Sequence, residues 1–439
     1  MLKVLEQQEI TLNLIREDVD FLLKINDDLV KKNTFTGSTD PVEIKPVRPP
    51  LYLLKFNWIA GSLNLPCGIK IEVYPHLGDR NSDPTGFKER AIIFLNMFLK
   101  VYGIHKKLES VLENFPSTGA DLPGIESLLA QIYIKLLSET LQKEGQLPRN
   151  YVPEEKTESR IRGKILFRRD IPLELKVPHI YQKIYSRSPM TDLNLMLYQA
   201  LKLARQENDL ERQTRSTSLN LENEYFGFVN FTPSFKGRTS FILSQIKNNR
   251  LYRNFLLPAI VARMLIENTI SSPYGYKKLG TAFLINTPEL FEKYITLLLE
   301  EVLSEKIKSG EVEFRSQSSK AGGISHHLLK IVNENESTPI YSMTPDNTIR
   351  NRKTGETTII DTKYKIFNSI ETDAKKYGED LYQMYAYARA FKAKKVVLIY
   401  PSINEFSRHE AKFFDDSAQL SFLKIPLERP QEHLKEVLA

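Results

Sequence analysis

Two aspartates and one lysine in the last quarter of this 439-residue sequence are spaced for metal-dependent chemistry on phosphate esters. Asp361 and Lys363 stand two residues apart in IIDTKYK (residues 359–365), which we expect to be a β-strand, so both side chains would leave the same face. Asp346 follows Pro345 one hairpin earlier, and strand pairing would place it beside Asp361. Carboxylates hold Mg²⁺, which acidifies water and neutralises charge developing on phosphorus, while an ammonium group orients that water or adds positive charge. The pattern predicts Asp346 and Asp361 as Mg²⁺ ligands and Lys363 as the cation.

An ordinary ion pair on a solvated strand edge is the alternative interpretation of the same residues, because Asp-x-Lys is a common sequence. Two apolar residues, Ile359 and Ile360, lead directly into Asp361, so we expect this strand to be buried. Burying Asp and Lys together costs free energy unless the pair serves a purpose. The apolar residues therefore favour a functional site over a surface ion pair.

Two polar residues on the helix expected at residues 379–393 would support the site. Gln383 and Tyr387 are four residues apart and share one helical face. Tyr385 and Phe391 are interpreted as core aromatics, but an amide within an aromatic stripe requires a hydrogen-bonding partner. Glu292, on an earlier helix, is either a further acidic contributor or a solvent-facing helix carboxylate.

The elements that must position these residues form an α-β-β-α-β run in a domain expected at residues 279–439. A helix is expected over residues 287–307, with Thr287 as its N-cap and Pro288 at its first position. Strands are expected at 338–351, 357–367 and 395–401, with a turn at 353–355 and the helix at 379–393 between the last two strands. This order predicts a mixed sheet flanked by helices, and thus an α/β fold.

Three further regions precede this domain. Residues 1–50 are expected to be a helical extension (residues 11–32) followed by a Pro-rich linker (residues 34–50). Residues 51–160 begin with a small β unit, in which Ile71 and Val73 alternate with Glu72 and Tyr74 as if one face were wet, and continue as a β/α domain. Residues 161–278 are expected to be a mostly helical middle region.

Composition limits the class of protein and of cofactor. The net charge of +7 permits a polyanionic partner such as DNA without requiring one. One cysteine, Cys67, excludes disulfides within the chain, cysteine zinc sites and iron–sulfur clusters. The first residues interrupt their apolar positions with charges, and no stretch has the length of a membrane span, so we expect a cytoplasmic protein without membrane contact.

The motif residues together resemble a known nuclease superfamily. Pro-Asp, a hairpin and Asp-x-Lys are the signature of the PD-(D/E)XK fold, and Gln383 with Tyr387 resembles the Gln-x-x-x-Tyr motif of RecB-like nucleases. The resemblance implies for Glu292 the role of the acidic residue that such folds place on their leading helix. With FLINTPELFEKYI, VVLIYP and the upstream segments GSLNLPCGIKIEVYPHLG and GKILFRRDI, the chain resembles the McrC family from about residue 52 onward.

Members of that family are the cleavage subunits of McrBC-type modification-dependent restriction systems. The resemblance implies a Mg²⁺-dependent endonuclease that cuts double-stranded, methylcytosine-containing DNA. It also implies a partner, a McrB-like AAA+ GTPase hexamer that binds the GTP and is stimulated through residues 51–160. The sequence itself carries no G-x-x-x-x-G-K-[ST] phosphate-binding loop, so GTP would be bound by the partner and not by this chain.

Two other functions stay open from the sequence. One is a non-catalytic activator or scaffold of the NTPase partner, in which the nuclease fold is vestigial. The other is a stand-alone RecB-like DNA repair nuclease, which would cut unmodified DNA without a partner.

Overall fold

The chain is a mixed α/β protein that divides into two compact units. The computed structural model describes residues 2–31, 40–77, 86–102, 125–166, 180–207, 210–231, 233–271, 280–317, 325–332, 337–368, 377–415 and 417–438. Unit 1 comprises Met1–Leu122 and Ser271–Ala439, and unit 2 comprises Pro123–Ile270. Unit 1 therefore joins the two ends of the sequence, and unit 2 is inserted between them.

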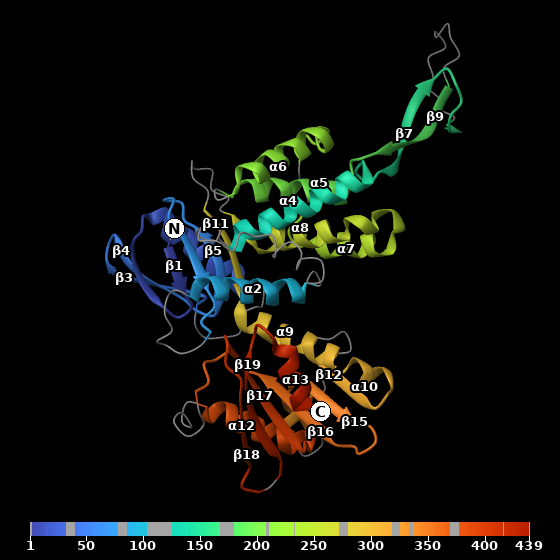
Figure 1. Cartoon of the computed structure of the whole chain (residues 1–439). Coiled ribbons are helices and arrows are strands. Elements are labelled where there is room, and N and C mark those ends of the chain that lie inside the picture. The colour runs from blue at the N-terminus through green and yellow to red at the C-terminus, as the bar shows by residue number, and fades with distance from the viewer. Residues whose placement is uncertain are drawn as a thin grey trace. The chain divides into compact units, whose positions relative to one another are not determined.

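The first part of unit 1 is built from two sheets. Its elements are β1 (Leu2–Leu5), β2 (Glu9–Asn13), α1 (Arg16–Lys31), β3 (Val42–Arg48), β4 (Leu51–Phe56), β5 (Ile59–Asn64), β6 (Lys70–Tyr74) and α2 (Phe87–Val101). With β11 (Thr281–Asn286), the described strands of this unit give an N-terminal sheet of order β1-β6-β5-β11, and a second sheet has the order β2-β4-β3. Figure 1 labels β1, β5 and β11 of the first sheet and β3 and β4 of the second. The short strand β10 (Thr269–Ser271) spans the boundary at which unit 2 ends.

Residues 1–50 differ from the expected helix and linker. The helix is present as α1, but β1 and β2 precede it, and the linker prediction is wrong where β3 forms. Pro46 lies within β3 because β3 is the edge strand of its sheet, where a missing N–H group is tolerated, and the register shifts between Pro46 and Arg48. The predicted solvent-exposed face of β6 is also wrong. Glu72 and Tyr74 are buried because β6 lies between β1 and β5 and packs against α2.

The N-terminal sheet leads directly into the C-terminal half of unit 1. Strand β11 pairs antiparallel with β5, and α9 (Thr287–Val302) begins at the next residue. The approach of these strands is close at Gly61, where an added Cβ would lie 1.9 Å from the carbonyl oxygen of Phe283. With a φ of +143° as well, this position accepts only glycine. The start of α9 is therefore fixed by the N-terminal sheet.

A mixed sheet is the framework of the C-terminal half. The further elements are α10 (Ser304–Lys308), β12 (Val312–Ser316), β13 (His326–Val332), β14 (Ser337–Met343), β15 (Asn347–Asn351), β16 (Thr357–Thr362), α12 (Gly378–Phe391), β17 (Lys395–Ser402), β18 (Ser407–Lys412), β19 (Gln419–Pro426) and α13 (Pro430–Leu438). Six described strands form the C-terminal sheet in the order β12-β15-β16-β17-β19-β18. Strand β16 is antiparallel to β15 and parallel to β17, with α12 as the crossover.

The core of this half lies between α12 and the C-terminal sheet. Ile359 of β16, Val396 and Leu398 of β17, and Met384 of α12 are fully or almost fully buried there. Apolar residues recur along α12 at helical spacing, and every second residue of β17, such as Val396 and Leu398, belongs to the same core cluster, so their burial fixes the helix on the sheet. The side chain of Asp361, near the end of β16, is thereby held in a defined position.

Local predictions for this half are confirmed in kind and corrected in detail. The expected helices and the strand at 395–401 are present as α9, α12 and β17. The N-cap of α9 is Asn286, whose side chain accepts from the Glu289 N–H, so the assignment to Thr287 is wrong by one residue. The expected strand at 338–351 is two strands, β14 and β15, because residues 344–346 leave the extended pairing before Asn347.

Unit 2 is a helical bundle that carries a β-hairpin. Its elements are α4 (Ile125–Glu144), β7 (Asn150–Glu158), β8 (Lys164–Ile165), β9 (Ile180–Ser188), α5 (Asp192–Arg205), α6 (Arg212–Tyr225), α7 (Thr239–Asn248), the 3₁₀ helix η2 (Arg250–Phe255) and α8 (Leu256–Asn268). Figure 1 shows β7 and β9 extending away from these helices. The expected boundary between residues 160 and 161 falls inside the hairpin, since β7 pairs with β9. The boundary at 278 lies outside the described residues.

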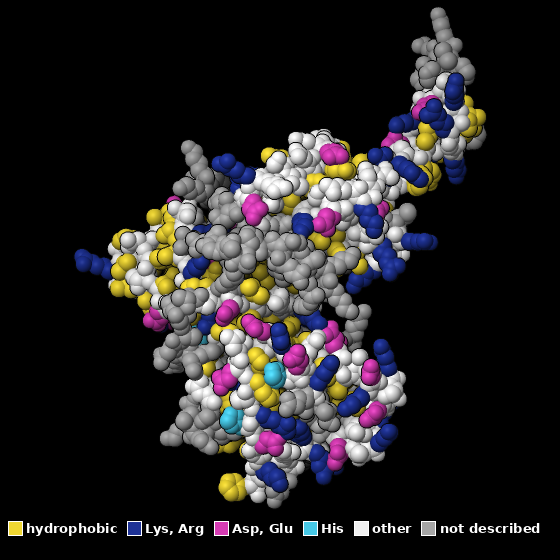
Figure 2. Space-filling model, viewed as in Figure 1, with side chains coloured by type: hydrophobic (Ala, Val, Ile, Leu, Met, Phe, Trp, Pro, Cys, Tyr) yellow, Lys and Arg dark blue, Asp and Glu magenta, His cyan; other side chains and the backbone are white. Residues whose placement is uncertain are grey.

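Charges of both signs share the surface, as the modest net charge predicts, and the helices are those of a protein without a membrane-spanning helix in its described part. Figure 2 shows Lys and Arg side chains interspersed with Asp and Glu over the visible face of the C-terminal half. Among the described residues, the helices are all too short or too polar to cross a membrane.

Candidate active site

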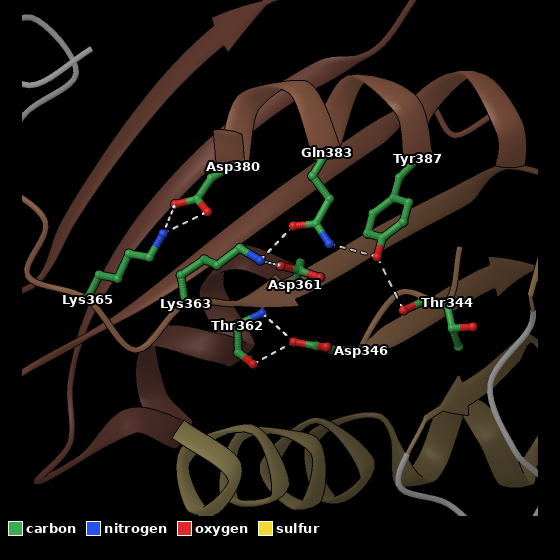
Figure 3. Close-up of polar contacts among 9 residues, drawn as sticks. All are labelled: Thr344, Asp346, Asp361, Thr362, Lys363, Lys365, Asp380, Gln383 and Tyr387. Carbon is green, nitrogen blue, oxygen red and sulfur yellow. Dashed lines mark hydrogen bonds and ion pairs between the residues drawn. The ribbon is translucent and has the colours of Figure 1, made fainter. Parts of the chain in front are cut away.

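The two aspartates lie on neighbouring strands at one end of the hairpin formed by β15 and β16. In the register of this hairpin Asn347 is opposite Ile360, so Asp346 and Asp361, the next residues outward, are neighbours. Asp346 Oδ2 accepts hydrogen bonds from the Thr362 N–H (2.7 Å) and from Thr362 Oγ1 (2.6 Å). These bonds to the side chain hold the Asp346 carboxylate beside the end of β16 (Figure 3).

Lys363 is the positively charged member of the site and contacts Asp361. It follows β16 directly, its N–H donates to the Ile399 carbonyl of β17 (2.8 Å), and its Nζ lies 2.6 Å from Asp361 Oδ2. Asp361 is 2% exposed and the Lys363 side chain 17% exposed. The predicted meeting of carboxylate and ammonium is confirmed, and it takes place in a buried setting.

Gln383 and Tyr387 connect the group to α12 and to the segment before Asp346. Lys363 Nζ donates to Gln383 Oε1 (2.8 Å), and Gln383 Nε2 donates to the Tyr387 hydroxyl (2.9 Å). The Tyr387 hydroxyl in turn donates to the Thr344 carbonyl (3.3 Å), two residues before Asp346 (Figure 3). The partly buried Gln383 amide therefore has the partners that the sequence argument required, and they fix Lys363.

Burial and mutual repulsion set the charge of the site. Burial, together with the negative charge of Asp346, raises the pKa of Asp361 from its ordinary value of 3.8 to about 7, although Lys363 opposes the change. Burial also raises the pKa of Asp346, against the hydrogen bonds from Thr362. For Lys363, burial lowers the pKa, but the charge and hydrogen bond of Asp361 together with the charges of Asp380 and Asp346 outweigh it, so the pKa is raised. The folded protein therefore favours the protonated form of both carboxyl groups more than the unfolded chain does, although Lys363 opposes this.

Glu292 lies on the α9 side of the same group. Four residues further along α9, Thr296 Oγ1 donates to the Asn347 side chain (2.9 Å), which places this face of the helix against the start of β15. Burial, and then the negative charges of Asp346 and Asp361, raise the pKa of Glu292 to about 7, with Lys293 opposing. Glu292 is therefore a partly buried carboxyl that interacts electrostatically with both aspartates.

An ion pair that the sequence interpretation did not assign lies beside the site. Lys365 Nζ is 3.0 Å from Asp380 Oδ1, and Asp380 is buried at the start of α12 (Figure 3). Asp380 precedes Gln383 by three residues and Tyr387 by seven, so helical spacing alone would have placed all three on one face. This pair anchors the segment after Lys363 to the same helix.

The donor atoms suit a divalent cation of the Mg²⁺ type. Within the described ranges, no three His, Cys, Asp or Glu side chains are grouped to hold a metal ion by themselves. Mg²⁺ is commonly bound through only one or two carboxylates, with water and substrate phosphate oxygens as the remaining ligands. Asp346 and Asp361 offer those carboxylates, and burial raises the pKa of both, so their charged forms are disfavoured unless a cation stabilises them.

A mixed sheet with two carboxylates and an ammonium group at one end of a hairpin defines an α/β protein with a buried acidic site. Its fold is similar to that of a chain in the refined half-complex from a tetradecameric assembly of Thermococcus gammatolerans McrB AAA+ hexamers with bound McrC. The TM-score is 0.67 at 16% identity, over 99% of this chain and 99% of that one. A second match is to the Thermococcus gammatolerans McrBC complex, with a TM-score of 0.49 at 16% identity over 69% and 88% of the two chains.

Sequence comparison identifies the family. The family model for the McrBC 5-methylcytosine restriction system component matches residues 54–401, which is more than half of the chain. No curated protein matches. The chain belongs to the McrBC 5-methylcytosine restriction system component family.

Proposed function

We propose that this chain is the endonuclease subunit of a McrBC-like restriction system, with a PD-(D/E)XK arrangement in the C-terminal half of unit 1. It would cut double-stranded DNA that contains methylcytosine, together with a McrB-like AAA+ GTPase hexamer whose GTP hydrolysis it stimulates. The observation that carries the proposal is the convergence of Asp346, Asp361 and Lys363 at one end of the β15–β16 hairpin.

Each residue of the site has a role that follows from its contacts. Asp346 and Asp361 would hold Mg²⁺, and Glu292 would add negative charge on the α9 side. When bound, Mg²⁺ would acidify the attacking water and neutralise charge on the scissile phosphate. Lys363 has a raised pKa, so it remains an ammonium group that can orient water or contact a phosphate oxygen.

Gln383 and Tyr387 act on the reaction through Lys363. Gln383 Oε1 accepts from the ammonium group, and Tyr387 holds the other end of the amide. A long lysine side chain loses rotamer freedom when it is fixed in this way before the substrate arrives, so part of the entropic cost of ordering is met by folding. The two residues are therefore positioning residues for the cation.

Family membership and sequence support the partner. The matched Thermococcus gammatolerans assembly contains McrB AAA+ hexamers with bound McrC. The present sequence has no G-x-x-x-x-G-K-[ST] loop, so GTP binding would fall to the partner. The net charge of +7 is compatible with a DNA substrate.

The test is to purify the chain with a McrB-like AAA+ GTPase and to measure DNA cleavage and GTP hydrolysis separately. Mg²⁺, GTP and methylated double-stranded DNA would be present, and each component would be omitted in turn. We expect cleavage only in the complete mixture, and faster GTP hydrolysis when the chain is added. Stimulated GTP hydrolysis without any cleavage would favour the scaffold function, and cleavage of unmodified DNA without a partner would favour a stand-alone repair nuclease.

A further inference from the structure

A buried carboxyl group directly after the first strand contacts two segments that carry site residues. Glu6 directly follows β1 and continues its pairing, since the Glu6 N–H donates to the Tyr74 carbonyl of β6 (3.0 Å). Its residue exposure is 0%. Nothing in the role assigned to the C-terminal half requires a carboxylate at this place in the N-terminal sheet.

The two oxygens of Glu6 are used by different parts of unit 1. Glu6 Oε1 accepts a hydrogen bond from Thr287 Oγ1. Glu6 Oε2 accepts from the Tyr364 hydroxyl (2.9 Å) and from the His76 N–H (3.1 Å). One carboxyl group therefore links the first strand, the first residue of α9 and the segment after β16.

Both side-chain partners are adjacent to the active site. Tyr364 is the residue after Lys363, and Thr287 begins the helix that carries Glu292. The ring of Tyr364 is enclosed by Trp58, with centroids 6.1 Å apart, and by Phe291, at 5.9 Å. Glu6 holds the hydroxyl of Tyr364, and two aromatic rings pack against its ring, so Tyr364 has little freedom to move. Because Lys363 precedes Tyr364 in the chain, its backbone is restricted as well.

Retaining a carboxyl group here costs free energy. Burial raises the pKa of Glu6 to about 7, although the hydrogen bonds from Thr287, His76 and Tyr364 and the charge of Arg90 all oppose this. A buried ionisable group is often replaceable by apolar residues without loss of stability, so its presence calls for a purpose other than stability.

We propose that Glu6 is a positioning residue for the cleavage reaction, which acts through Tyr364 to fix Lys363 and through Thr287 to fix the start of α9. The N-terminal sheet is then part of the support of the active site, although it lies at the other end of the sequence. The inference rests on the proposed endonuclease function and adds to it a residue more than 350 positions before Lys363.

The test uses the full chain with its AAA+ partner, GTP, Mg²⁺ and methylated double-stranded DNA, and compares Tyr364→Phe with Tyr74→Phe. Both substitutions remove the hydroxyl of a buried tyrosine that donates to a glutamate, Glu6 for Tyr364 and Glu72 for Tyr74. The phenylalanine keeps the ring contacts in each case. Only Tyr364 is the neighbour of Lys363 in the chain, so Tyr74→Phe is the control for a general loss of stability.

We expect Tyr364→Phe to lower the maximal cleavage rate about 10- to 100-fold at unchanged KM for DNA, as loss of a supporting hydrogen bond does at other metal sites. Tyr74→Phe should leave the rate unchanged. Glu6→Gln, which keeps an acceptor oxygen, should retain most of the rate that Glu6→Ala loses. Tyr364→Phe cutting at the wild-type rate, or both tyrosine variants slowing equally, would overturn this inference while the endonuclease function stands. A wild-type chain that does not cut would overturn both.

Discussion

Asp361→Asn should stabilise the metal-free protein at alkaline pH. Burial and the neighbouring Asp346 raise the pKa of Asp361 from 3.8 to about 7, so the folded state prefers the proton. Stability from this preference is complete below the unfolded pKa and is lost as the pH rises through the folded pKa. A difference of roughly three pH units corresponds to a cost of ~4 kcal/mol for charging Asp361 above that range.

The amide in Asp361→Asn cannot ionise and so avoids this cost, but it no longer pairs with Lys363. The pKa of about 7 already includes the opposing effect of Lys363, so we expect the free energy of unfolding of unit 1 to rise by ~4 kcal/mol at about pH 8. Near pH 5 Asp361 is mostly protonated, and an amide and a neutral carboxyl of the same shape should then differ little. Added Mg²⁺ should reverse the order, because it stabilises the wild type by binding and the variant much less.

The chain offers a selective probe for this experiment. Trp58 is the single tryptophan, and its ring packs edge-on against that of Tyr364 in unit 1. Denaturant unfolding followed by tryptophan fluorescence at both pH values gives the comparison. Asp380→Asn is the matched control: it makes the same chemical change at a buried aspartate but breaks the ion pair with Lys365, so it should destabilise. Loss of stability in Asp361→Asn at about pH 8 without metal would refute the reasoning.

Three further predictions follow from the same contacts. Gln383→Ala should lower the cleavage rate about 10- to 100-fold without a change in the unfolding midpoint, because it releases Lys363; an unchanged rate would remove Gln383 from the site. Glu292→Gln should raise the Mg²⁺ concentration that gives half-maximal cleavage, since it removes negative charge close to both aspartates; an unchanged Mg²⁺ titration would make it an ordinary helix residue. Gly61→Ala should destabilise unit 1 by ~3 kcal/mol or more, measured by Trp58 fluorescence, because its Cβ would overlap the Phe283 carbonyl; a stability equal to the wild type would contradict the described packing.

The sequence predicted those parts of the site that depend on local spacing. Gln383 and Tyr387 are separated by one helical turn, so helix periodicity was enough to place them. Asp361 and Lys363 meet as expected, but β16 ends at Thr362, so strand periodicity accounts for Asp361 and not for Lys363. Asp346 required only a hairpin between adjacent strands. The N-cap of α9 was misplaced by one residue because Asn286 and Thr287 are both good capping residues, and only the backbone geometry chooses between them.

Contacts between distant segments were not predictable in this way. The bond between Glu6 and Tyr364 and the pairing of β11 with β5 join residues more than 200 positions apart, and no local pattern encodes them. The β3 strand was missed because Pro46 argues against regular pairing, and its tolerance at a sheet edge becomes evident only once the sheet order is known. Asp380 had a usable signal in its spacing from Gln383, and it was overlooked.

The most direct test of the proposed active site is a comparison of cleavage and GTPase stimulation in Asp361→Ala and Lys363→Ala. Each variant would be assayed with the AAA+ partner, GTP, Mg²⁺ and methylated double-stranded DNA, after its folding has been checked by Trp58 fluorescence. Both variants should stimulate GTP hydrolysis like the wild type and leave the DNA intact. If either of them, correctly folded, cuts the DNA at the wild-type rate, the assignment of the active site is wrong.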